Sequence, residues 1–296
     1  MIIIIPTRNR IKKLIKTLNF LKKNFFFFKK LIIVDSSDIN FKNKIKNRIK
    51  KYNLDIKLIN SVPSTSIQRN LGFSYAQNNK FIMFLDDDIN FYSNAFKNMH
   101  NYLKKIDNKI VGISFNLIAK KPTNFFSLLK QNFIFDKIGF YRNNSGMISR
   151  SGWQTTFGNF NKNQKVEWMP TGAAIYRTKA IKKIRFEEKF TDYGYLEDLD
   201  FSIKLRKKGE LMVCKDAKFT HDMSGDKSNF NFGKKEFINR FFIVKKYNFS
   251  KVLFFIVFFF RMIITLLKAF SGDMKYFKRF LGNITALLEI NNLNKN

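Results

Sequence analysis

Apolar residues in the first part of the chain follow two different spacings. Three short runs consist of apolar residues alone, at residues 2–5, 31–34 and 81–85, and such runs are typical of strands buried on both faces. Between the runs, apolar residues recur every three or four positions, as on one face of a helix. The predicted elements are, in chain order, strand 2–5, helix 11–21, strand 31–34, helix 42–51, strand 56–60, helix 64–75, strand 81–85, helix 93–105 and strand 110–115.

This alternation predicts an α/β fold in which helices cover a mostly parallel sheet. Ligands of such sheets bind beyond the carboxyl ends of the strands. Asp35 and Asp86 both stand at the carboxyl ends of predicted strands, with 51 positions from one to the other. We therefore expect these two acids to line one crevice.

The helix predicted at 64–75 has two candidate caps, Ser64 and Ser66, since a serine oxygen can accept a hydrogen bond from the first helical turn. Ile67, Leu71 and Tyr75 are spaced to share one face of this helix.

The middle of the chain is less regular. Residues 120–165 are rich in Asn, Ser, Gly and Phe, and we expect long loops or an insertion over the site. Regular patterns return at residues 168–177 and at 198–207, where the second segment has helical spacing and Gly209 favours a helix stop.

From about residue 230 the chain becomes basic and aromatic. Its stretch 252–267 is apolar apart from Arg261, which makes it shorter than the roughly 20 uninterrupted apolar residues of a membrane-spanning helix. Flanking lysines favour a helix in the membrane interface. The alternative is a helical appendage that packs its aromatic face on the globular part. We expect two domains, at residues 1–228 and 229–296.

The formal net charge of +33 has two compatible explanations. A basic surface attracts phosphate in nucleotides, lipids or nucleic acids. Abundant Lys, Asn, Ile and Phe also point to AT-rich codons. The one cysteine, Cys214, excludes an intrachain disulfide and is expected to be a small buried hydrophobe. The short apolar run before Pro6 does not have the pattern of a signal peptide, which favours a cytoplasmic location.

The acidic run Asp86-Asp87-Asp88 follows a buried strand. Adjacent carboxylates repel one another unless a cation neutralises them, and Mg²⁺ binds one or two carboxylates together with substrate phosphates. The run therefore predicts a metal–diphosphate site, although a solvated acidic turn has the same sequence.

Further motifs follow in a fixed order. They are Pro6-Thr7-Arg8-Asn9-Arg10, Asp35-Ser36-Ser37-Asp38, Gln68-Arg69-Asn70-Leu71-Gly72, Asp86-Asp87-Asp88, Thr171-Gly172-Ala173-Ala174, Leu196-Glu197-Asp198-Leu199-Asp200 and Thr220-His221. In this order and spacing the chain, from Ile2 to about Ser224, resembles the inverting glycosyltransferase family 2. The resemblance implies a GT-A fold, which is a Rossmann-like nucleotide-diphospho-sugar transferase domain.

The resemblance also implies roles on the donor side. Asp86 would lie near the ribose, and Asp88 would bind the metal, Mg²⁺ or Mn²⁺, that bridges the diphosphate. His221 matches a position that often supplies a further metal ligand. Asp35 would accept a hydrogen bond from a base similar to uracil or thymine. The residues implied to contact the nucleotide are Pro6, Thr7, Arg8, Asn9, Asp35, Arg69, Asp86 and Asp87.

On the acceptor side, Glu197 and Asp198 resemble the family's Glu-Asp pair, with Asp198 as general base. Gly172 and Trp168 would lie near the donor sugar or acceptor, and Trp168 is either a core residue or a platform for a sugar ring. Acids at 197–200 are also common at helix N-termini, and His221 could be a structural histidine.

Elementary chemistry supports two separate acidic clusters. A base must take the proton of the attacking acceptor hydroxyl, and a cation stabilises the departing diphosphate. We therefore expect an inverting transferase that moves one sugar from a UDP-, GDP- or dTDP-linked donor to a glycan or lipid-linked acceptor. It would work at the cytoplasmic face of the cell membrane, with peripheral contact through residues 252–267 and no nucleic-acid partner.

Two rival interpretations stay open at this stage. A nucleotidyltransferase could use a similar crevice, but it usually carries a Gly-rich loop after the first strand, where this chain has Pro6-Thr7-Arg8-Asn9-Arg10. A non-enzymatic basic protein that binds nucleic acid or membrane would explain the charge but not the ordered acidic motifs.

Overall fold

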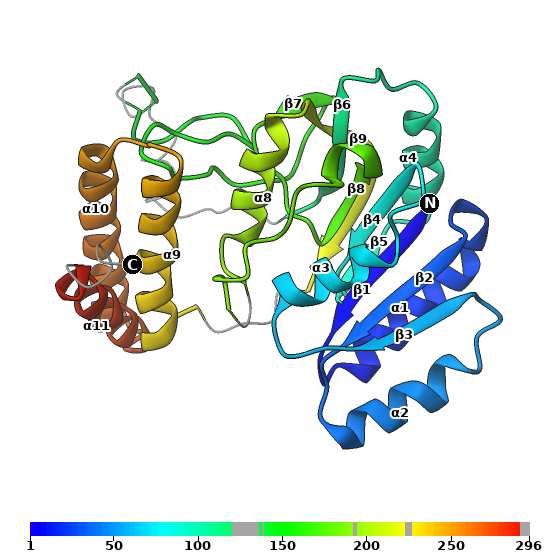
Figure 1. Cartoon of the computed structure of the whole chain (residues 1–296). Coiled ribbons are helices and arrows are strands. Elements are labelled where there is room, and N and C mark those ends of the chain that lie inside the picture. The colour runs from blue at the N-terminus through cyan, green and yellow to red at the C-terminus, as the bar shows by residue number, and fades with distance from the viewer. Residues whose placement is uncertain (120–135, 138, 192–193, 223–226, 291–296) are drawn as a thin grey trace. The chain divides into compact units, whose positions relative to one another are not determined.

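The computed structural model describes residues 1–119, 136–137, 139–191, 194–222 and 227–290 (Figure 1). The chain forms two compact units, which are described separately below. One comprises residues 1–120 and 157–223, and the other comprises residues 121–156 and 224–296. The first unit holds the predicted sheet, and the second holds three long helices.

The first unit is built around a nine-stranded sheet of order β3-β2-β1-β4-β8-β6-β9-β5, with β7 paired to β9. Its strands are β1 Ile2–Thr7, β2 Lys30–Asp35, β3 Ile56–Asn60, β4 Phe81–Leu85, β5 Ile89–Phe91, β6 Ile110–Leu117, β7 Gln164–Val166, β8 Ala173–Arg177 and β9 Glu210–His221. Its helices are α1 Ile11–Lys23, the 3₁₀ turn η1 Phe25–Phe27, α2 Ile39–Ile49, α3 Thr65–Ser74, α4 Ala95–Leu103, α7 Thr178–Ile181 and α8 Glu197–Arg206.

The sheet is parallel in its first half and mixed in its second. Strands β3, β2, β1 and β4 are all parallel neighbours. Strand β8 runs antiparallel to both β4 and β6, and it separates them. Strand β9 pairs parallel with β6 and antiparallel with β5. This arrangement confirms the α/β class and brings the ends of β1, β4 and β9 to the same region of the sheet.

Helices cover both faces of the sheet (Figure 1). Leu14 and Leu18 of α1 and Phe96 of α4 pack with Ile3 and Ile5 of β1 on one face. The other face of β1 and its neighbours packs against α3 through Phe73 and against α8 through Phe201 and Leu205. Cys214 is a buried free cysteine, as the sequence indicated.

The side of α3 that is buried differs from the side on which its apolar residues are spaced. Ile67, Leu71 and Tyr75 share a face of the helix as predicted, but Tyr75 is exposed and Ile67 and Leu71 are only partly buried, so this face is not the buried side. The residues buried along α3 are Ser66, Gln68, Arg69, Gly72 and Phe73. Gly72 makes this close approach possible, because a Cβ there would lie 2.4 Å from Ile4 Cγ2. The cap at Ser64 is confirmed, since its side chain accepts a hydrogen bond from the Ile67 N–H.

The second unit contains α9 Phe230–Lys246, α10 Lys251–Phe270 and α11 Lys275–Leu288. Aromatic residues dominate the core between them, with Phe237 and Phe241 of α9 against Phe254 and Phe258 of α10. Trp153 belongs to the same core, so part of the irregular middle segment groups with the C-terminal helices. The predicted domain boundary after residue 228 stays a prediction. Of the loop region expected at 120–165, residues 120–135 and 138 lie outside the described part of the chain.

Candidate active site

The acidic run lies immediately after β4, and its members face different partners. Asp87 is buried and accepts hydrogen bonds from Thr7 Oγ1 at 2.6 Å and Arg10 at 3.4 Å, while its backbone carbonyl accepts one from Thr17. Burial raises the pKa of Asp87 to about 6, although the bond from Thr7 and the charge of Arg10 act against this. Asp87 thus links the end of β1, the loop that follows it and helix α1 to the acidic run.

Asp88 is surrounded by cationic groups. Its Oδ2 accepts hydrogen bonds from Arg10 and Lys13, both at 3.1 Å, and its Oδ1 lies 2.8 Å from His221 Nε2. Burial tends to raise the pKa of Asp88, but the His221 and Lys13 contacts outweigh it and lower that pKa. Burial conversely tends to lower the pKa of His221, and the bond to Asp88 raises it. Asp88 is therefore held as a carboxylate.

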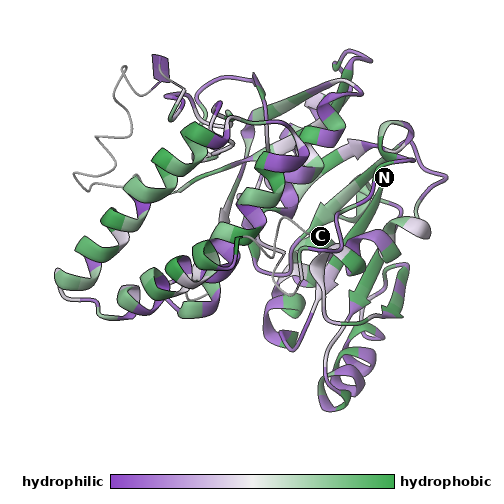
Figure 2. Cartoon of the chain, turned by 60° about the vertical axis from the view of Figure 1, so that its left-hand side comes forward, coloured by the Kyte–Doolittle hydropathy of each residue, from purple (hydrophilic) through white to green (hydrophobic). Residues whose placement is uncertain are grey.

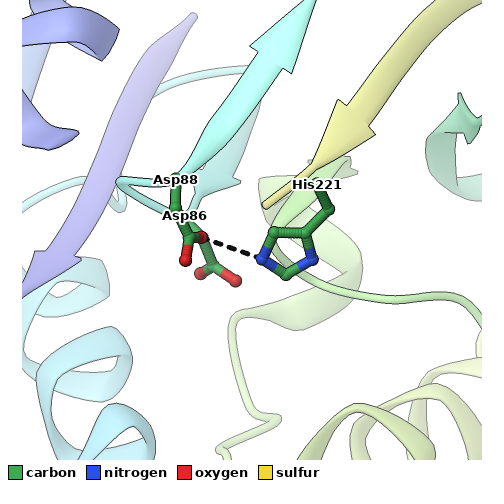
Figure 3. A group of neighbouring side chains, drawn as sticks. All are labelled: Asp86, Asp88 and His221. Atoms are coloured by element: carbon green, nitrogen blue, oxygen red, sulfur yellow. Dashed lines mark hydrogen bonds and ion pairs between the residues drawn. The ribbon is translucent and has the colours of Figure 1, made fainter. Parts of the chain in front are cut away.

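Asp86, Asp88 and His221 form a group suited to a divalent cation (Figure 3). One ligand atom from each lies within 4.8 Å of the others. The antiparallel pairing of β5 with β9 creates this juxtaposition, because Ile89 is opposite His221 in the register and Asp88 directly precedes Ile89. Two carboxylates and an imidazole are ligands that divalent metals accept in proteins. The residues present therefore fit the metal predicted from the acidic run.

Arg69 lies behind this group and links it to a second acidic cluster. Its guanidinium is buried, donates to Asp86 Oδ1 at 2.7 Å and to Glu197 Oε1, and lies 3.6 Å from Asp198 Oδ1. Glu197 also accepts a 2.6 Å hydrogen bond from Ser66. Burial tends to lower the pKa of Arg69, but the surrounding carboxylates outweigh it and raise that pKa, so Arg69 stays cationic. A single fixed cation thus holds three carboxylates in place.

Asp198 is the more accessible acid of the second cluster, with a side chain 34% exposed. Its Oδ1 accepts hydrogen bonds from the Thr171 N–H at 3.2 Å and from Thr171 Oγ1. Leu196, just before α8, has a left-handed backbone with φ of 76°, which turns the chain so that Glu197 and Asp198 begin the helix. Burial raises the pKa of Asp198, against the lowering effects of Arg69 and Thr171. A raised pKa makes a carboxylate a stronger base.

The loops after β1 and β2 are tied to one another. Asn9 has a φ of 54°, its N–H donates to Ser37 Oγ at 2.7 Å, and its amide donates to Asp38 at 2.8 Å. Asp35 is fully buried, and its Oδ1 accepts a hydrogen bond from the Ser37 N–H at 2.9 Å. Among the described residues, no hydrogen-bond donor reaches Asp35 Oδ2. Strand β1 pairs with both β2 and β4, so one strand separates Asp35 from Asp86, and their sharing of a crevice stays a prediction.

A family model described as glycosyl transferase family 2 matches residues 2–185. The chain belongs to glycosyl transferase family 2. The chain is therefore a glycosyltransferase, and neither a nucleotidyltransferase nor a non-enzymatic basic protein. None of the curated proteins compared with this family 2 chain matches it significantly in sequence.

Solved structures with the same fold include two other glycosyltransferases. TarS 1–349 from S. aureus aligns with a TM-score of 0.53 and 16% identity over 92% of this chain and 72% of that one. The complex of TarS 1–349 with UDP-GlcNAc aligns with a TM-score of 0.52 and 17% identity over 81% of this chain and 65% of that one. GalNAc-T7 with UDP, GalNAc and Mn²⁺ aligns with a TM-score of 0.62 and 13% identity over 94% of this chain and 53% of that one.

At these identities the likeness shows the GT-A fold and nothing finer. This family 2 chain spans 43% of a longer TarS structure and about half of the GalNAc-T7 chain. The fold predicted from the ordered motifs is thereby confirmed.

The structure also locates four other residues that were predicted for the family 2 site. A Cβ on Gly172 would come within 2.2 Å of Asp86 Oδ2, so Gly172 leaves room for that carboxylate. Pro6 is buried at the end of β1, and Arg8 is exposed in the loop that follows. Trp168 is half-buried, and its ring contacts Phe157 at 5.7 Å between centroids, which places at least one edge of it in the core.

Several site residues escaped the sequence analysis. Gln68 is buried and donates to the backbone carbonyls of Thr7 at 3.0 Å and Val34 at 2.7 Å, so it joins the ends of β1 and β2. Lys13 and Thr171 contact Asp88 and Asp198 as described above. Gln68 could have been found from its place in a quoted motif, but Lys13 is one of many lysines and carries no such signal.

Proposed function

We propose that this glycosyltransferase moves one sugar, with inversion, from a nucleotide-diphosphate donor to an acceptor hydroxyl. The observation that carries the proposal is the arrangement around Arg69. On one side lies the Asp86, Asp88 and His221 group, and on the other lies Asp198, which is partly exposed. A cation site for the departing diphosphate and a base for the acceptor therefore stand side by side, as the chemistry requires.

The donor nucleotide is proposed to bind at the ends of β1, β2 and β4. Asp35 Oδ2 is buried without a donor among the described residues, and it would accept a hydrogen bond from the base N–H. The loop of Thr7, Arg8 and Asn9 would contact the nucleotide, together with Arg69 and Asp86. Asp87 would act through this loop, since its carboxylate already binds Thr7. The TarS complex contains UDP-GlcNAc and the GalNAc-T7 structure contains UDP, which makes a UDP-sugar the first donor to test.

A divalent cation is proposed to be held by Asp88 and His221, with Asp86 nearby. When bound, it would neutralise charge on the leaving diphosphate. The GalNAc-T7 structure contains Mn²⁺. The test below compares Mn²⁺ with Mg²⁺ for this chain.

Asp198 is proposed as the general base. Its carboxylate would take the proton from the acceptor hydroxyl, whose oxygen attacks the anomeric carbon on the face opposite the leaving diphosphate. The two hydrogen bonds from Thr171 fix the carboxylate orientation. Glu197 is buried against Arg69 and Ser66, so it would position Arg69 and not meet the acceptor.

The acceptor is proposed to be a glycan or a lipid-linked saccharide, made at the cytoplasmic face of a membrane. The expected membrane contact through residues 252–267 is part of this proposal and is supported by the apolar helix α10.

A panel of UDP-, GDP- and dTDP-sugars, screened by thermal shift with Mn²⁺, Mg²⁺ or EDTA, tests the donor. A bound donor raises the melting temperature by mass action. The correct donor should stabilise the protein only with metal, and release of nucleoside diphosphate should stop in EDTA. Full activity in EDTA would contradict the metal assignment.

Two aspartate variants separate the roles. Asp88→Asn should lower the metal-dependent thermal shift and the rate together. Asp198→Asn should keep the shift and lower the transfer rate by about 10²–10⁴-fold. Asp55→Asn, at an exposed carboxylate remote from the proposed machinery, is the matched control. An Asp198→Asn enzyme with the rate of the control would remove Asp198 from the mechanism.

A further inference from the structure

Helix α10 carries an apolar stripe that remains largely exposed. Six residues at helical spacing have exposed fractions between 45% and 71%, and we call them the outer stripe: Val252, Ile256, Phe259, Ile263, Leu267 and Phe270. Figure 2 shows hydrophobic residues along most of the length of α10. A contiguous exposed apolar surface of this kind marks an interaction site.

The opposite side of α10 is packed within its own unit. Phe254, Val257 and Phe258 are buried in the aromatic core shared with α9 and α11. Arg261, which interrupts the apolar sequence, also belongs to this inner side. Its guanidinium donates to Glu236 of α9 at 3.2 Å and to the Tyr141 hydroxyl at 3.3 Å. The arginine therefore has protein partners and leaves the outer stripe apolar.

This division bears on whether α10 crosses a membrane or lies on one. Among the described residues, α10 is the helix long and apolar enough to cross, since 20 residues extend about 30 Å. Crossing would carry the inner side into the bilayer, with Arg261 and its ion-paired partner Glu236. Charged groups in hydrocarbon are costly. An orientation in the plane of the membrane immerses the outer stripe and leaves the inner side on α9 and α11.

The charge near α10 identifies the partner. From Lys245 to Lys278 the sequence contains six lysines and Arg261 but a single acid, Asp273. The lysines flank both ends of the helix, at Lys245, Lys246, Lys251, Lys268, Lys275 and Lys278. Basic residues that border an apolar helical face favour anionic lipid headgroups, with the apolar side chains between the headgroups and acyl chains.

We propose that α10 is an in-plane membrane helix that inserts its outer stripe into an anionic bilayer while its inner side stays packed on α9 and α11. The occupant of the exposed face is thus a lipid surface and not a second copy of the chain. This proposal rests on the membrane contact in the proposed function and makes it specific. Vesicle binding does not require the transfer reaction, so the proposal can fail while the transferase assignment stands.

The test compares two double variants of the full chain in vesicle co-sedimentation. Ile256→Glu with Ile263→Glu places two carboxylates in the outer stripe. Ile39→Glu with Val62→Glu makes the same charge change at exposed apolar positions of the other unit. The vesicles are phosphatidylcholine with or without phosphatidylglycerol. The stripe variant should bind mixed vesicles at least about tenfold more weakly than wild type, because two apolar side chains no longer insert. The control should lose much less.

Both variants should have the melting temperature of the wild-type chain, so that a loss of vesicle binding does not come from unfolding. Equal vesicle binding by the two double variants would overturn the proposal. Alkaline carbonate should extract the wild-type chain from membranes, and a chain that resists extraction would be a spanning protein instead. A dimer in light scattering that the stripe variant dissociates, without lipid binding by the wild type, would assign the stripe to self-association.

Discussion

The Arg69 side chain contacts both acidic clusters, the one at Asp86 and the one at Glu197 and Asp198. Its planar guanidinium donates in two directions at once, to Asp86 and to Glu197, and approaches Asp198 with the same nitrogen that binds Glu197. A lysine ammonium is a point charge and cannot reproduce this fork. Because three carboxylates converge on one cation, the site depends on the shape of that cation as well as on its charge.

Arg69→Lys should therefore lower the rate of transfer by about 10–100-fold, because the carboxylates lose their common positioning partner. Steady-state kinetics with the donor that the thermal-shift screen selects would measure this loss. Arg177→Lys is the control, since Arg177 is partly buried and donates to backbone carbonyls away from the site. Equal effects of the two substitutions would argue that Arg69 is structural only.

Gly172 supplies a second prediction at this scale. A methyl group there would lie 2.2 Å from Asp86 Oδ2, so the Asp86 carboxylate must turn away from the metal group. Gly172→Ala should raise the metal concentration needed for half-maximal activity by about tenfold. Circular dichroism should change little, because the shift is confined to the Asp86 side chain, and the melting temperature should fall slightly as Asp86 loses part of its ion pair with Arg69. An unchanged metal requirement would separate Asp86 from the cation site.

Individual strands and helices were largely predictable from the sequence, but the strand pairings and side-chain contacts between them were not. Continuous apolar runs identify β1, β2 and β4 because strands buried on both faces leave no polar side. The buried side of α3 could not be predicted from the spacing of its apolar residues. Gln68 and Arg69 are buried through hydrogen bonds, which apolar periodicity does not detect. The pairing of His221 with Asp88 depends on the antiparallel contact of β5 with β9, and a three-residue strand gives no pattern in the sequence.

Helix α9 yields a prediction about acid sensitivity. Burial tends to raise the pKa of Glu236, but Arg261 and Arg279 outweigh it, with a further contribution from Arg240, and lower that pKa to about 2. A depressed folded-state pKa stabilises the fold above the ordinary value near 4.5, and this stabilisation is lost as pH falls toward 2. The difference corresponds to about 3 kcal/mol at neutral pH.

Glu236→Gln should therefore lower the free energy of unfolding at pH 7, and the difference from wild type should shrink steadily as the pH falls from about 5 to about 2. Urea unfolding followed by circular dichroism at several pH values measures it. Glu289→Gln, at a half-exposed pair with Lys234 in the same unit, should change stability much less at every pH. A pH-independent difference would show that packing and not charge is responsible.

At the scale of the whole molecule, the second unit is assembled from two separate stretches of sequence. Trp153 precedes the C-terminal helices by more than 70 residues, yet its ring lies 3.8 Å from the Arg240 guanidinium and within the aromatic core. Sequence patterns are local, so a boundary placed where composition changes cannot detect such a contact.

A chain ending at residue 228 should consequently be poorly folded, because Tyr141 and Trp153 would lose the core that buries them. Increased binding of a hydrophobic dye and loss of soluble yield would show this. Residues 229–296 supplied as a separate chain should restore solubility. A truncated chain that is monomeric and melts cooperatively would contradict the prediction.

The hydrogen bonds of the site also have a consequence for the order of folding. Asp88 and His221 are 133 positions apart, and Ser66 and Glu197 are 131 apart. Contacts that close such long loops form after local structure, since their entropic cost must be met first. Helices can therefore appear during synthesis or refolding well before Asp88 meets His221 or Ser66 meets Glu197. The proposed cation site and base would then arise late, and a partly folded chain would not consume a donor prematurely.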